Sequence, residues 1–147
     1  MKTAIYVRSS VKNNSSLIDQ ENAIRKSLGK KETVYRVYKD SSCSGTDLNR
    51  PGLRQLLSDA ENRKFQIVFV SDPQRLSRSL TTYASLLNKF DNLGIAIKSK
   101  DVDLSSLTGR FHASILMATA DYERATRSER IKIGLKNRLA KKRGRNA

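Results

Sequence analysis

The sequence predicts an α/β fold, in which a mainly parallel sheet of about four to five strands has helices on both faces and is followed by a long C-terminal helix. Short apolar segments typical of buried strands recur along the chain, and segments with the apolar spacing of helices lie between them. Strands that alternate with helices of ten or more residues favour a parallel sheet covered on both faces. The expected strands span residues 3–7, 33–38, 65–70 and 94–99.

Three helices are expected between these strands, because apolar residues recur there at intervals of three and four positions. The first spans the apolar positions 17–28, and the second spans positions 53–60, with Pro51 suited to its first turn. The third spans positions 80–90 and ends near Gly94.

The charge of the chain is strongly basic and unevenly distributed. Lys and Arg total 29 against 14 acidic residues, which gives a formal net charge of +15 and a pI near 10.3. Residues 124–147 contain ten of the basic residues and one acid, so this tail carries +9 and the first 123 residues carry +6. A basic tail on a modestly basic body is the electrostatic footprint of nucleic-acid binding. A solvated helix end explains the same charges without a ligand.

The last segment, residues 107–143, is expected to form one long helix, because it contains no proline and only two glycines. A helix of about 30 residues is about 45 Å long, whereas a domain of this size is about 40 Å across. Its own domain cannot cover such a helix along its whole length. We expect its first half to pack on the body or on a partner subunit, and its basic second half to project onto DNA.

Several classes of protein are excluded by residue types that are rare or missing. Cys43 is the single cysteine and His112 the single histidine, so a disulfide framework, a zinc site and a Ser-His-Asp triad are not expected. His112 is expected to be structural. The chain has no glycine-rich phosphate-binding motif, and no cofactor is expected. No apolar segment approaches the roughly 20 residues of a membrane span, and no secretion signal opens the chain, so we expect a cytoplasmic protein.

Arginine and serine residues gather where three of the predicted strands end. Because the carboxyl ends of parallel strands meet at one edge of the sheet, these side chains can converge there. Guanidinium groups are always charged, planar and able to donate in pairs, which suits them to bind phosphate. Several of them around a hydroxyl would stabilise the charge of a phosphoryl-transfer transition state. The residues are Arg8 and Ser10 after the first strand, Ser44 and Arg50 after the second, and Arg75 and Arg78 after the third.

Five motifs, in the same order, resemble the catalytic domain of the serine recombinases, the family of resolvases, invertases and serine integrases. YVRSS at 6–10 resembles the Y-x-R-x-S pattern that opens the family, and LIDQ supplies the glutamine that follows, Gln20. DSSCSGTDLNRPGL at 40–53 resembles the loop after the second strand, and its NRPG segment is most similar to large serine integrases and transposon recombinases. QRLSR at 74–78 resembles the D-R-L-x-R signature, and ER at 123–124 resembles the E-R pair of the long helix.

The resemblance implies a site-specific DNA recombinase whose nucleophile is Ser10. In that mechanism Ser10 attacks a phosphodiester, forms a 5′-phosphoserine link and releases a 3′-OH, and religation needs neither metal nor ATP. The resemblance leaves the group that deprotonates Ser10 unassigned, since no histidine is available. The residues that it implies are, for the phosphate charge, Arg8, Arg75 and Arg78 with Arg50 and Arg124, and, for positioning, Ser44 and Gln20.

Alternation along a strand separates Ser9 from Ser10. Residues two apart in a strand point to the same side, and neighbours point to opposite sides. If Arg8 faces the site, Ser10 shares its side and Ser9 does not, so Ser9 is expected to pack or to cap. Without the resemblance, an N-cap or turn before the first helix would be the simpler interpretation of Ser10.

The same resemblance implies the partners and the division of the chain. Residues 1–106 would form the α/β catalytic core, and residues 107–147 a dimerisation helix with a basic, DNA-contacting end. Family members act as homodimers that pair into tetramers on double-stranded DNA, and no small-molecule substrate is expected. They usually continue into a DNA-recognition domain, so we expect this chain to be part of a longer protein. The expected DNA contacts come from Lys136, Arg138, Lys141, Lys142, Arg143 and Arg145.

One position departs from the family pattern. Gln74 stands where the family usually has an aspartate before the first arginine, and Asp72 lies two residues earlier, with Pro73 between them. A glutamine can accept a hydrogen bond from a guanidinium but cannot act as a carboxylate base. Whether Asp72 takes over depends on the geometry of this turn. Two other interpretations stay open: a catalytically impaired DNA-binding relative, and a small phosphatase or nucleotide-binding flavodoxin-like domain.

Overall fold

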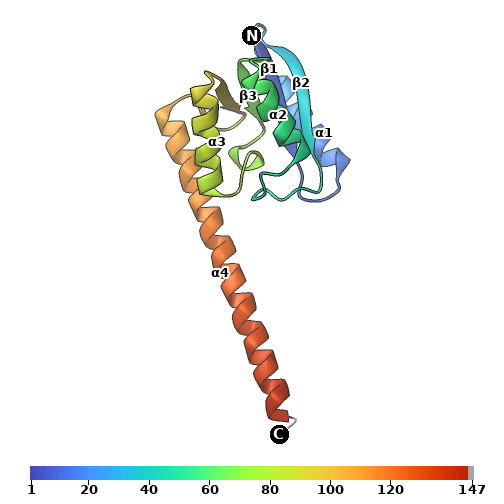
Figure 1. The fold of residues 1–147 in the computed structure, drawn as a ribbon, viewed down its shortest axis with the longest axis vertical. Coiled ribbons are helices and arrows are strands. Elements are labelled where there is room, and N and C mark those ends of the chain that lie inside the picture. Colours follow the sequence, from blue (N-terminus) through green and yellow to red (C-terminus); the bar gives the residue numbers. More distant parts are fainter. Residues whose placement is uncertain (146–147) are drawn as a thin grey trace.

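A computed structural model describes residues 1–145 of the chain. Its centre is a sheet of four parallel strands in the order β2-β1-β3-β4 (Figure 1). The predicted α/β fold with a parallel sheet is confirmed, and each strand begins and ends within two residues of its expected bounds. The strands are β1 (Lys2–Arg8), β2 (Thr33–Asp40), β3 (Ile67–Val70) and β4 (Ala96–Ser99).

Helices cover both faces of the sheet, because neighbouring residues of a strand point to opposite sides. Ile5 and Val7 of β1 pack with the first helix on one face, and Ala4 and Tyr6 belong to a larger core on the other face. That larger core also contains apolar residues of the second, third and last helices. The helices are α1 (Asn14–Ser27), α2 (Pro51–Glu61), the short 3-10 turn η1 (Pro73–Arg75), α3 (Leu80–Asn92) and α4 (Leu107–Arg145).

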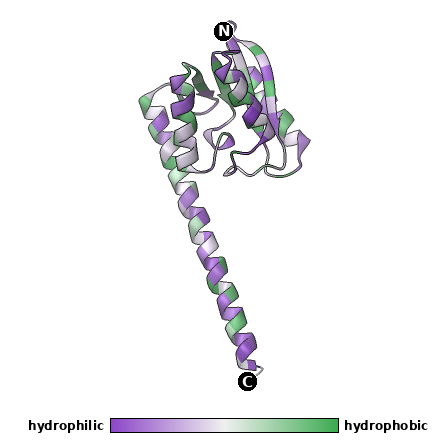
Figure 2. Ribbon diagram, viewed as in Figure 1, coloured by the Kyte–Doolittle hydropathy of each residue, from purple (hydrophilic) through white to green (hydrophobic). Residues whose placement is uncertain are grey.

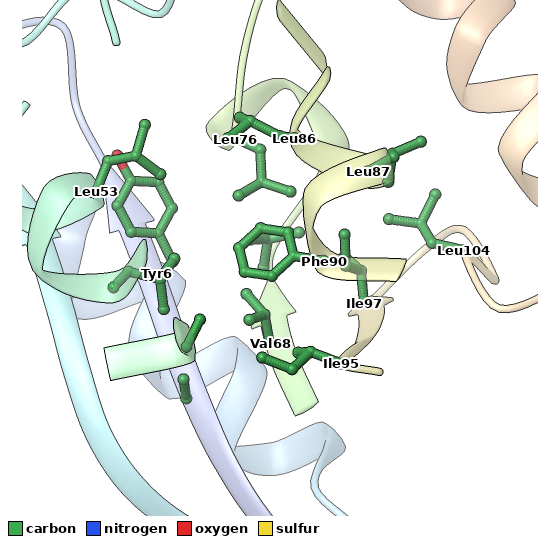
Figure 3. Close-up of a cluster of buried hydrophobic side chains, with 14 of the residues drawn as sticks. Tyr6, Leu53, Val68, Leu76, Leu86, Leu87, Phe90, Ile95, Ile97 and Leu104 are labelled. Atoms are coloured by element: carbon green, nitrogen blue, oxygen red, sulfur yellow. The ribbon is translucent and has the colours of Figure 1, made fainter. Parts of the chain in front are cut away.

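The larger core reaches the loop that joins β3 to α3. Figure 3 shows this core, in which Phe90 of α3 comes together with Leu76 of the loop and Val68 of β3. Leu76 is fully buried. Burial of a leucine side chain stabilises a fold by about 1.5–3 kcal/mol, so Leu76 anchors a loop that is otherwise polar.

The strand order reverses beside β1, because α1 carries the chain to β2 on one side and α2 carries it back to β3 on the other. In open parallel sheets such a switch point leaves a crevice at the carboxyl ends of the two central strands, where ligands bind. Here β1 ends at Arg8 and β3 ends at Val70, and the loops 9–13, 41–50 and 71–79 lie at the same edge. A site at this edge draws on residues from all three loops.

α4 is much longer than the body of the domain and projects from it (Figure 1). Its 39 residues correspond to about 58 Å of helix, and the predicted long C-terminal helix is confirmed. Residues 127–145 are all exposed, and hydrophilic residues predominate there, with apolar ones between them (Figure 2). Among the described residues, no helix combines the length and the apolar character that crossing a membrane requires.

The face of α4 that packs on the body is made largely of small residues. Gly109, Ala113 and Met117 are buried, whereas Phe111 and Tyr122 are exposed over 62% and 73% of their surface. A Cβ on Gly109 would lie 1.7 Å from the carbonyl oxygen of Asp103, so the helix and the preceding loop approach more closely than any other residue allows. Apart from Met117, the larger apolar side chains of α4 are exposed.

Candidate active site

Arg8, the last residue of β1, joins the three loops at the carboxyl edge of the sheet. It is fully buried, and its guanidinium donates to three backbone carbonyls. Nη1 donates to Cys43 at 2.9 Å, Nε to Arg75 at 3.3 Å and Nη2 to Gln74 at 3.4 Å. These carbonyls satisfy the donors of Arg8 but do not neutralise its charge.

The charge of Arg8 lies close to other positive charges. Burial, together with the neighbouring guanidinium groups of Arg78 and Arg50, lowers the pKa of Arg8 to about 10. Like charges that are held together away from water destabilise one another, and a bound anion relieves that repulsion. The arginine cluster is therefore an environment that favours a negatively charged group.

Gln20 of α1 fixes the backbone of Arg8. Its Oε1 accepts a hydrogen bond from the Arg8 N–H at 3.2 Å, and its Nε2 donates to the Arg8 carbonyl at 3.1 Å. Nε2 also donates to Oγ of Ser16 at 3.3 Å. Gln20 is buried, so the backbone at the end of β1 is held from α1 by a side chain that is shielded from water.

The loop between β3 and α3 carries Arg75 and Arg78 on either side of the buried Leu76. Asp72 is the N-cap of η1, and its Oδ1 accepts from the Gln74 N–H at 3.0 Å. An N-cap aspartate satisfies a backbone donor that the turn itself leaves unpaired. Capped at its start and anchored at its centre, the loop holds both arginines by local structure.

Arg75 and Arg78 present their guanidinium groups differently. Nε of Arg75 donates to Oδ2 of Asp72 at 2.9 Å, and Nη1 of Arg75 donates to the Arg8 carbonyl at 3.4 Å. The backbone N–H of Arg78 donates to the Gly45 carbonyl at 2.9 Å, while its guanidinium makes no hydrogen bond to residues 1–145. Arg78 thus keeps all its side-chain donors for a ligand, and Arg75 keeps its Nη2.

Gly45 brings the loop after β2 against these arginines. A Cβ at this position would lie 2.7 Å from Cγ of Arg78 and 3.0 Å from Nη2 of Arg8, so only glycine fits. The preceding residue, Ser44, is exposed, and its Oγ lies 2.8 Å from Oγ1 of Thr46. The structure therefore places Ser44 beside the contact between the two loops, in a polar turn of its own.

Arg50 lies behind the loop that carries Arg75. It is only 1% exposed, and its Nη1 donates to the Tyr6 hydroxyl at 2.8 Å and to the Arg75 carbonyl at 3.2 Å. Its Nη2 donates to the Leu76 carbonyl. Both terminal nitrogens of Arg50 are thus engaged by the protein and support the loop from the side of the core, while its buried Nε has no hydrogen-bond partner among the described residues.

A buried carboxylate at the end of β2, Asp40, completes this network. It accepts hydrogen bonds from the Tyr6 hydroxyl at 2.7 Å and from the N–H groups of Gly52 and Leu53 at 2.7 and 2.9 Å. Burial raises the pKa of Tyr6 far above its usual range, while the charge of Arg50 opposes this shift and that of Asp40 adds to it. Tyr6 therefore stays a neutral donor, and Asp40 places its charge at the N-terminus of α2, where the helix dipole favours it.

A cavity of about 330 Å³ opens beside the arginine cluster. Arginines and aspartates line its polar part, and α4 closes another side with apolar side chains. Three guanidinium groups against two carboxylates leave the cavity positive. Its lining includes Arg8, Arg75 and Arg78, Asp72 and Asp101, and Leu116 and Met117 of α4.

Ser10 lies beyond the end of β1, two residues after Arg8, and it is exposed. It is not part of the cavity lining, and its hydroxyl makes no hydrogen bond to the part of the chain that the structure describes. Ser9 is 5% exposed, and its Oγ donates to the Val11 carbonyl at 2.8 Å. The Ser10 hydroxyl is thus accessible, and the Ser9 hydroxyl stabilises the turn that follows β1.

Arg124 ties the long helix to the loop of the site. Its Nη2 donates to the Arg78 carbonyl and to Oδ1 of Asp121. Oδ2 of Asp121 accepts from the Leu80 N–H at 3.0 Å, at the start of α3. Arg124 therefore connects α4 to the backbone of Arg78, one residue before Ser79 caps α3.

The basic residues predicted to contact DNA all lie on the projecting part of α4, away from the cavity (Figure 1). All six are exposed: Lys136, Arg138, Lys141, Lys142, Arg143 and Arg145. His112 is also exposed on α4. Within residues 1–145, no three His, Cys, Asp or Glu side chains gather as a metal site requires.

Several polar contacts of the site were not predicted from the sequence. Asp40 and Tyr6 stand inside two of the quoted motifs, but only burial reveals that they pair. Asp121 precedes Arg124 by three positions, a helical spacing that brings opposite charges together and that indicates an ion pair. The link from Asp121 to the Leu80 N–H depends on how α4 crosses α3, and no local pattern predicts that crossing.

Comparison with known proteins identifies the family. A family model described as the N-terminal domain of resolvases matches residues 3–146. A resolvase/recombinase of Pseudomonas putida is 34% identical over 101 residues, and the DNA-invertase hin of Salmonella typhimurium is 30% identical over 137 residues. The solved N-terminal catalytic domain of TP901-1 integrase is 32% identical, with a TM-score of 0.71 over 86% of this chain and 99% of that one. The chain belongs to the resolvase family, and the predicted resemblance to serine recombinases is confirmed.

The matches differ in how much of each relative they cover. The Pseudomonas putida match covers 67% of this chain and 54% of that protein, and the Salmonella typhimurium match covers 92% and 67%. The chain thus spans about half to two thirds of the length of these relatives, whereas the integrase domain matches over nearly all of its length.

Proposed function

We propose that the chain is the catalytic domain of a site-specific DNA recombinase that cuts and rejoins DNA through Ser10. The observation that carries this proposal is the convergence of Arg8, Arg75 and Arg78 at the carboxyl edge of the sheet, where β1 leads to an exposed Ser10. Membership of the resolvase family supports it, since the relatives carry the names DNA-invertase and serine recombinase.

In the proposed reaction, Oγ of Ser10 attacks the phosphorus of one DNA strand in line with the 3′ oxygen. The Oγ–P bond forms and the P–O3′ bond breaks, the Ser10 proton is released, and the 3′ oxygen takes up a proton. The 5′ phosphate remains joined to the protein. Attack by a 3′-OH reverses these changes, and because one phosphoester replaces another, the cycle needs no ATP.

Some of the arginines would contact the phosphate, and others would hold the backbone that carries them. Arg78 and Nη2 of Arg75 have donors available for the phosphate oxygens, and the buried charge of Arg8 acts close behind them. Positive charges stabilise a transition state best where folding has already fixed their positions before the substrate binds. Arg50 and Gln20 would act indirectly, because both hold the backbone that carries these arginines.

The long helix would serve assembly and DNA binding. Its exposed apolar residues, which include Phe111, Ile115 and Tyr122, offer a surface to a second copy in a homodimer. Its basic end, from Lys136 to Arg145, would bind the phosphate backbone of double-stranded DNA. Two such dimers would form the tetramer in which strands are exchanged.

The test of the proposal is a covalent adduct between protein and DNA. The chain is fused to a DNA-binding module of known site and given a substrate nicked near the cleavage point, so that the cut strand diffuses away. We expect an adduct that persists in EDTA, disappears with Ser10→Ala and remains with Ser9→Ala as the matched control. Confirmed DNA binding without an adduct, or an adduct that survives Ser10→Ala, would contradict the proposal.

Gln74 favours a second candidate, a relative that binds DNA without cutting it. In this case the protein would bind DNA in a salt-dependent manner and form no adduct. The variant Gln74→Asp would then restore cleavage, because it returns a carboxylate to the position before Arg75. An adduct with the unaltered chain excludes this candidate.

A further inference from the structure

We propose that Asp72 is the positioning residue for Arg75, and that it supplies the carboxylate that Gln74 cannot. The inference rests on the proposed recombinase function, because it concerns an arginine of that site. Gln74 departs from the family pattern, but the loop has an acidic partner for Arg75 two residues earlier in the chain.

The contacts of Asp72 show one carboxylate with two tasks. Its Oδ1 accepts from the Gln74 N–H at 3.0 Å and so begins the turn, and its Oδ2 accepts from Nε of Arg75 at 2.9 Å. The Ser71 hydroxyl donates to the same Oδ2 at 3.4 Å. The carboxylate that pairs with Arg75 is therefore the one that caps η1, and the cap restricts its orientation.

The 3-10 geometry explains why residue 72, and not residue 74, meets the arginine. A 3-10 helix has three residues per turn, so the side chains of residues i and i+3 lie above one another. Pro73 opens η1 and has a fixed φ, which sets this spacing between Asp72 and Arg75. Gln74 meets the arginines through its backbone, where its carbonyl accepts from Nη2 of Arg8 at 3.4 Å. Within the described residues, its side-chain amide makes no hydrogen bond to either arginine.

The pairing determines which face of the guanidinium a substrate meets. Asp72 engages Nε and the Arg8 carbonyl engages one N–H of Nη1, so Nη2 is the nitrogen of Arg75 that keeps both of its N–H groups for the cavity. Arg8 and Arg78 line the same cavity and repel Arg75. Without a carboxylate on its inner side, Arg75 would be free to turn away from them towards solvent. The side chain of Asp72 is 35% exposed, so its main contribution is orientation and not stability.

Three variants separate positioning from capping. Asp72→Asn keeps a good N-cap but removes the charge, whereas Asp72→Glu keeps the carboxylate but is a poorer N-cap. Asp103→Asn is the matched control, because Oδ1 of Asp103 also accepts from the N–H two residues ahead, that of Ser105 at 3.0 Å, whereas Asp103 lies outside the cavity lining and its carboxylate makes no hydrogen bond to an arginine within residues 1–145. The measurement is the rate of adduct formation at saturating protein, with the affinity for DNA and the thermal stability measured in parallel.

If Asp72 positions Arg75, Asp72→Glu should form the adduct faster than Asp72→Asn. If Asp72 only caps η1, Asp72→Asn should be the faster variant. We expect Asp72→Asn to slow adduct formation by about tenfold to a hundredfold, as a misplaced catalytic group does, with unchanged DNA affinity. Asp72→Glu should react faster than Asp72→Asn although it is the less stable protein, and Asp103→Asn should stay close to the unaltered chain. An Asp72→Asn variant as fast as the unaltered chain, or faster than Asp72→Glu, overturns the proposal.

A second measurement keeps this proposal separate from the recombinase function. The Nε–H resonance of Arg75, assigned by its loss in Arg75→Lys, is recorded without DNA. It should shift in Asp72→Asn and stay in place in Asp103→Asn. If the unaltered chain forms no adduct, the recombinase proposal fails, while this resonance still decides whether Asp72 holds Arg75. A resonance that Asp72→Asn does not move overturns the positioning proposal whatever the adduct assay shows.

Discussion

The carboxyl edge of the sheet and the projecting end of α4 hold their basic residues in opposite ways. At the edge, Arg8 and Arg50 are buried and donate to backbone carbonyls from separate loops. On α4, every described basic residue from Arg127 onward is exposed. Both regions are strongly positive, but only the first fixes its charges in space.

This difference assigns different tasks to the two regions. Charges that the fold holds rigidly can stabilise one geometry of a phosphate, at a cost in stability that the rest of the fold must offset. Charges on an exposed helix end attract any phosphate backbone and do not choose between geometries. Changes at the edge should therefore alter rate and stability, and changes on α4 should alter salt-dependent DNA affinity.

The largest expected effect is on the rate, at Arg78. Its guanidinium lines the cavity and is free of hydrogen bonds to the described residues, so its removal takes a donor from the substrate and leaves the fold intact. We expect Arg78→Ala to slow adduct formation by about a thousandfold without lowering the melting temperature. The control is Arg54→Ala on α2, which removes an exposed arginine outside the cavity lining. Equal effects of the two variants would show that the edge acts only through its net charge.

The second largest expected effect is a lower free energy of unfolding when Asp40 is replaced. This carboxylate accepts from the Tyr6 hydroxyl and from two backbone N–H groups, and it is 2% exposed. Asp40→Asn removes its charge and places an amide donor against these donors, so we expect the free energy of unfolding to fall by about 2–4 kcal/mol. Denaturant unfolding measures this change. Asp47→Asn, in the exposed loop that follows β2, should change it by less than about 0.5 kcal/mol.

A smaller effect is expected for DNA affinity at the end of α4. Replacing Lys141, Lys142 and Arg143 by alanine should reduce the slope of log affinity against log salt by about 2.7, or about 0.9 for each lost phosphate contact. Stability should not change, because these side chains are exposed. The matched control removes the same charge from the body, at Lys26, Lys30 and Lys31. If the control lost the same slope, DNA would contact the body as well, and the assignment of DNA binding to the end of α4 would be wrong.

The sequence predicted the frame of the site better than its internal contacts. The strands and helices follow from periodicity within each segment. The convergence of Arg8, Arg75 and Arg78 follows from the parallel sheet, because parallel strands end at the same edge. The position of Arg50 could not be predicted in the same way. Its neighbours, Tyr6 and the carbonyl of Leu76, come from distant parts of the chain. Burial behind a loop is a property of the assembled core.

The pairing of Asp72 illustrates the same limit at short range. The sequence shows an aspartate, a proline and a glutamine before Arg75, and it leaves open which side chain meets the guanidinium. An extended segment would place Pro73 on the same side as Arg75, whereas a helical turn places Asp72 beside it. The answer follows once η1 is known to begin at Pro73.

The smallest expected effect comes from one substitution made at two places in α4. Gly134 has no atom within 4 Å of an added Cβ, so Gly134→Ala should stabilise the helix locally by about 1 kcal/mol. Because residues 127–145 are exposed, this gain should leave the midpoint of global unfolding unchanged. It should slow hydrogen exchange of the amides around residue 134 by about fivefold, which 1 kcal/mol corresponds to.

Gly109→Ala provides the contrast, because its Cβ would lie 1.7 Å from the Asp103 carbonyl oxygen. There the same propensity gain is outweighed by a clash with backbone, and the midpoint of global unfolding should fall. If Gly134→Ala also moved the global midpoint, the projecting end of α4 would share the cooperativity of the body. Its charges would then be as firmly placed as those at the edge of the sheet, and the division of tasks between the two regions would be lost.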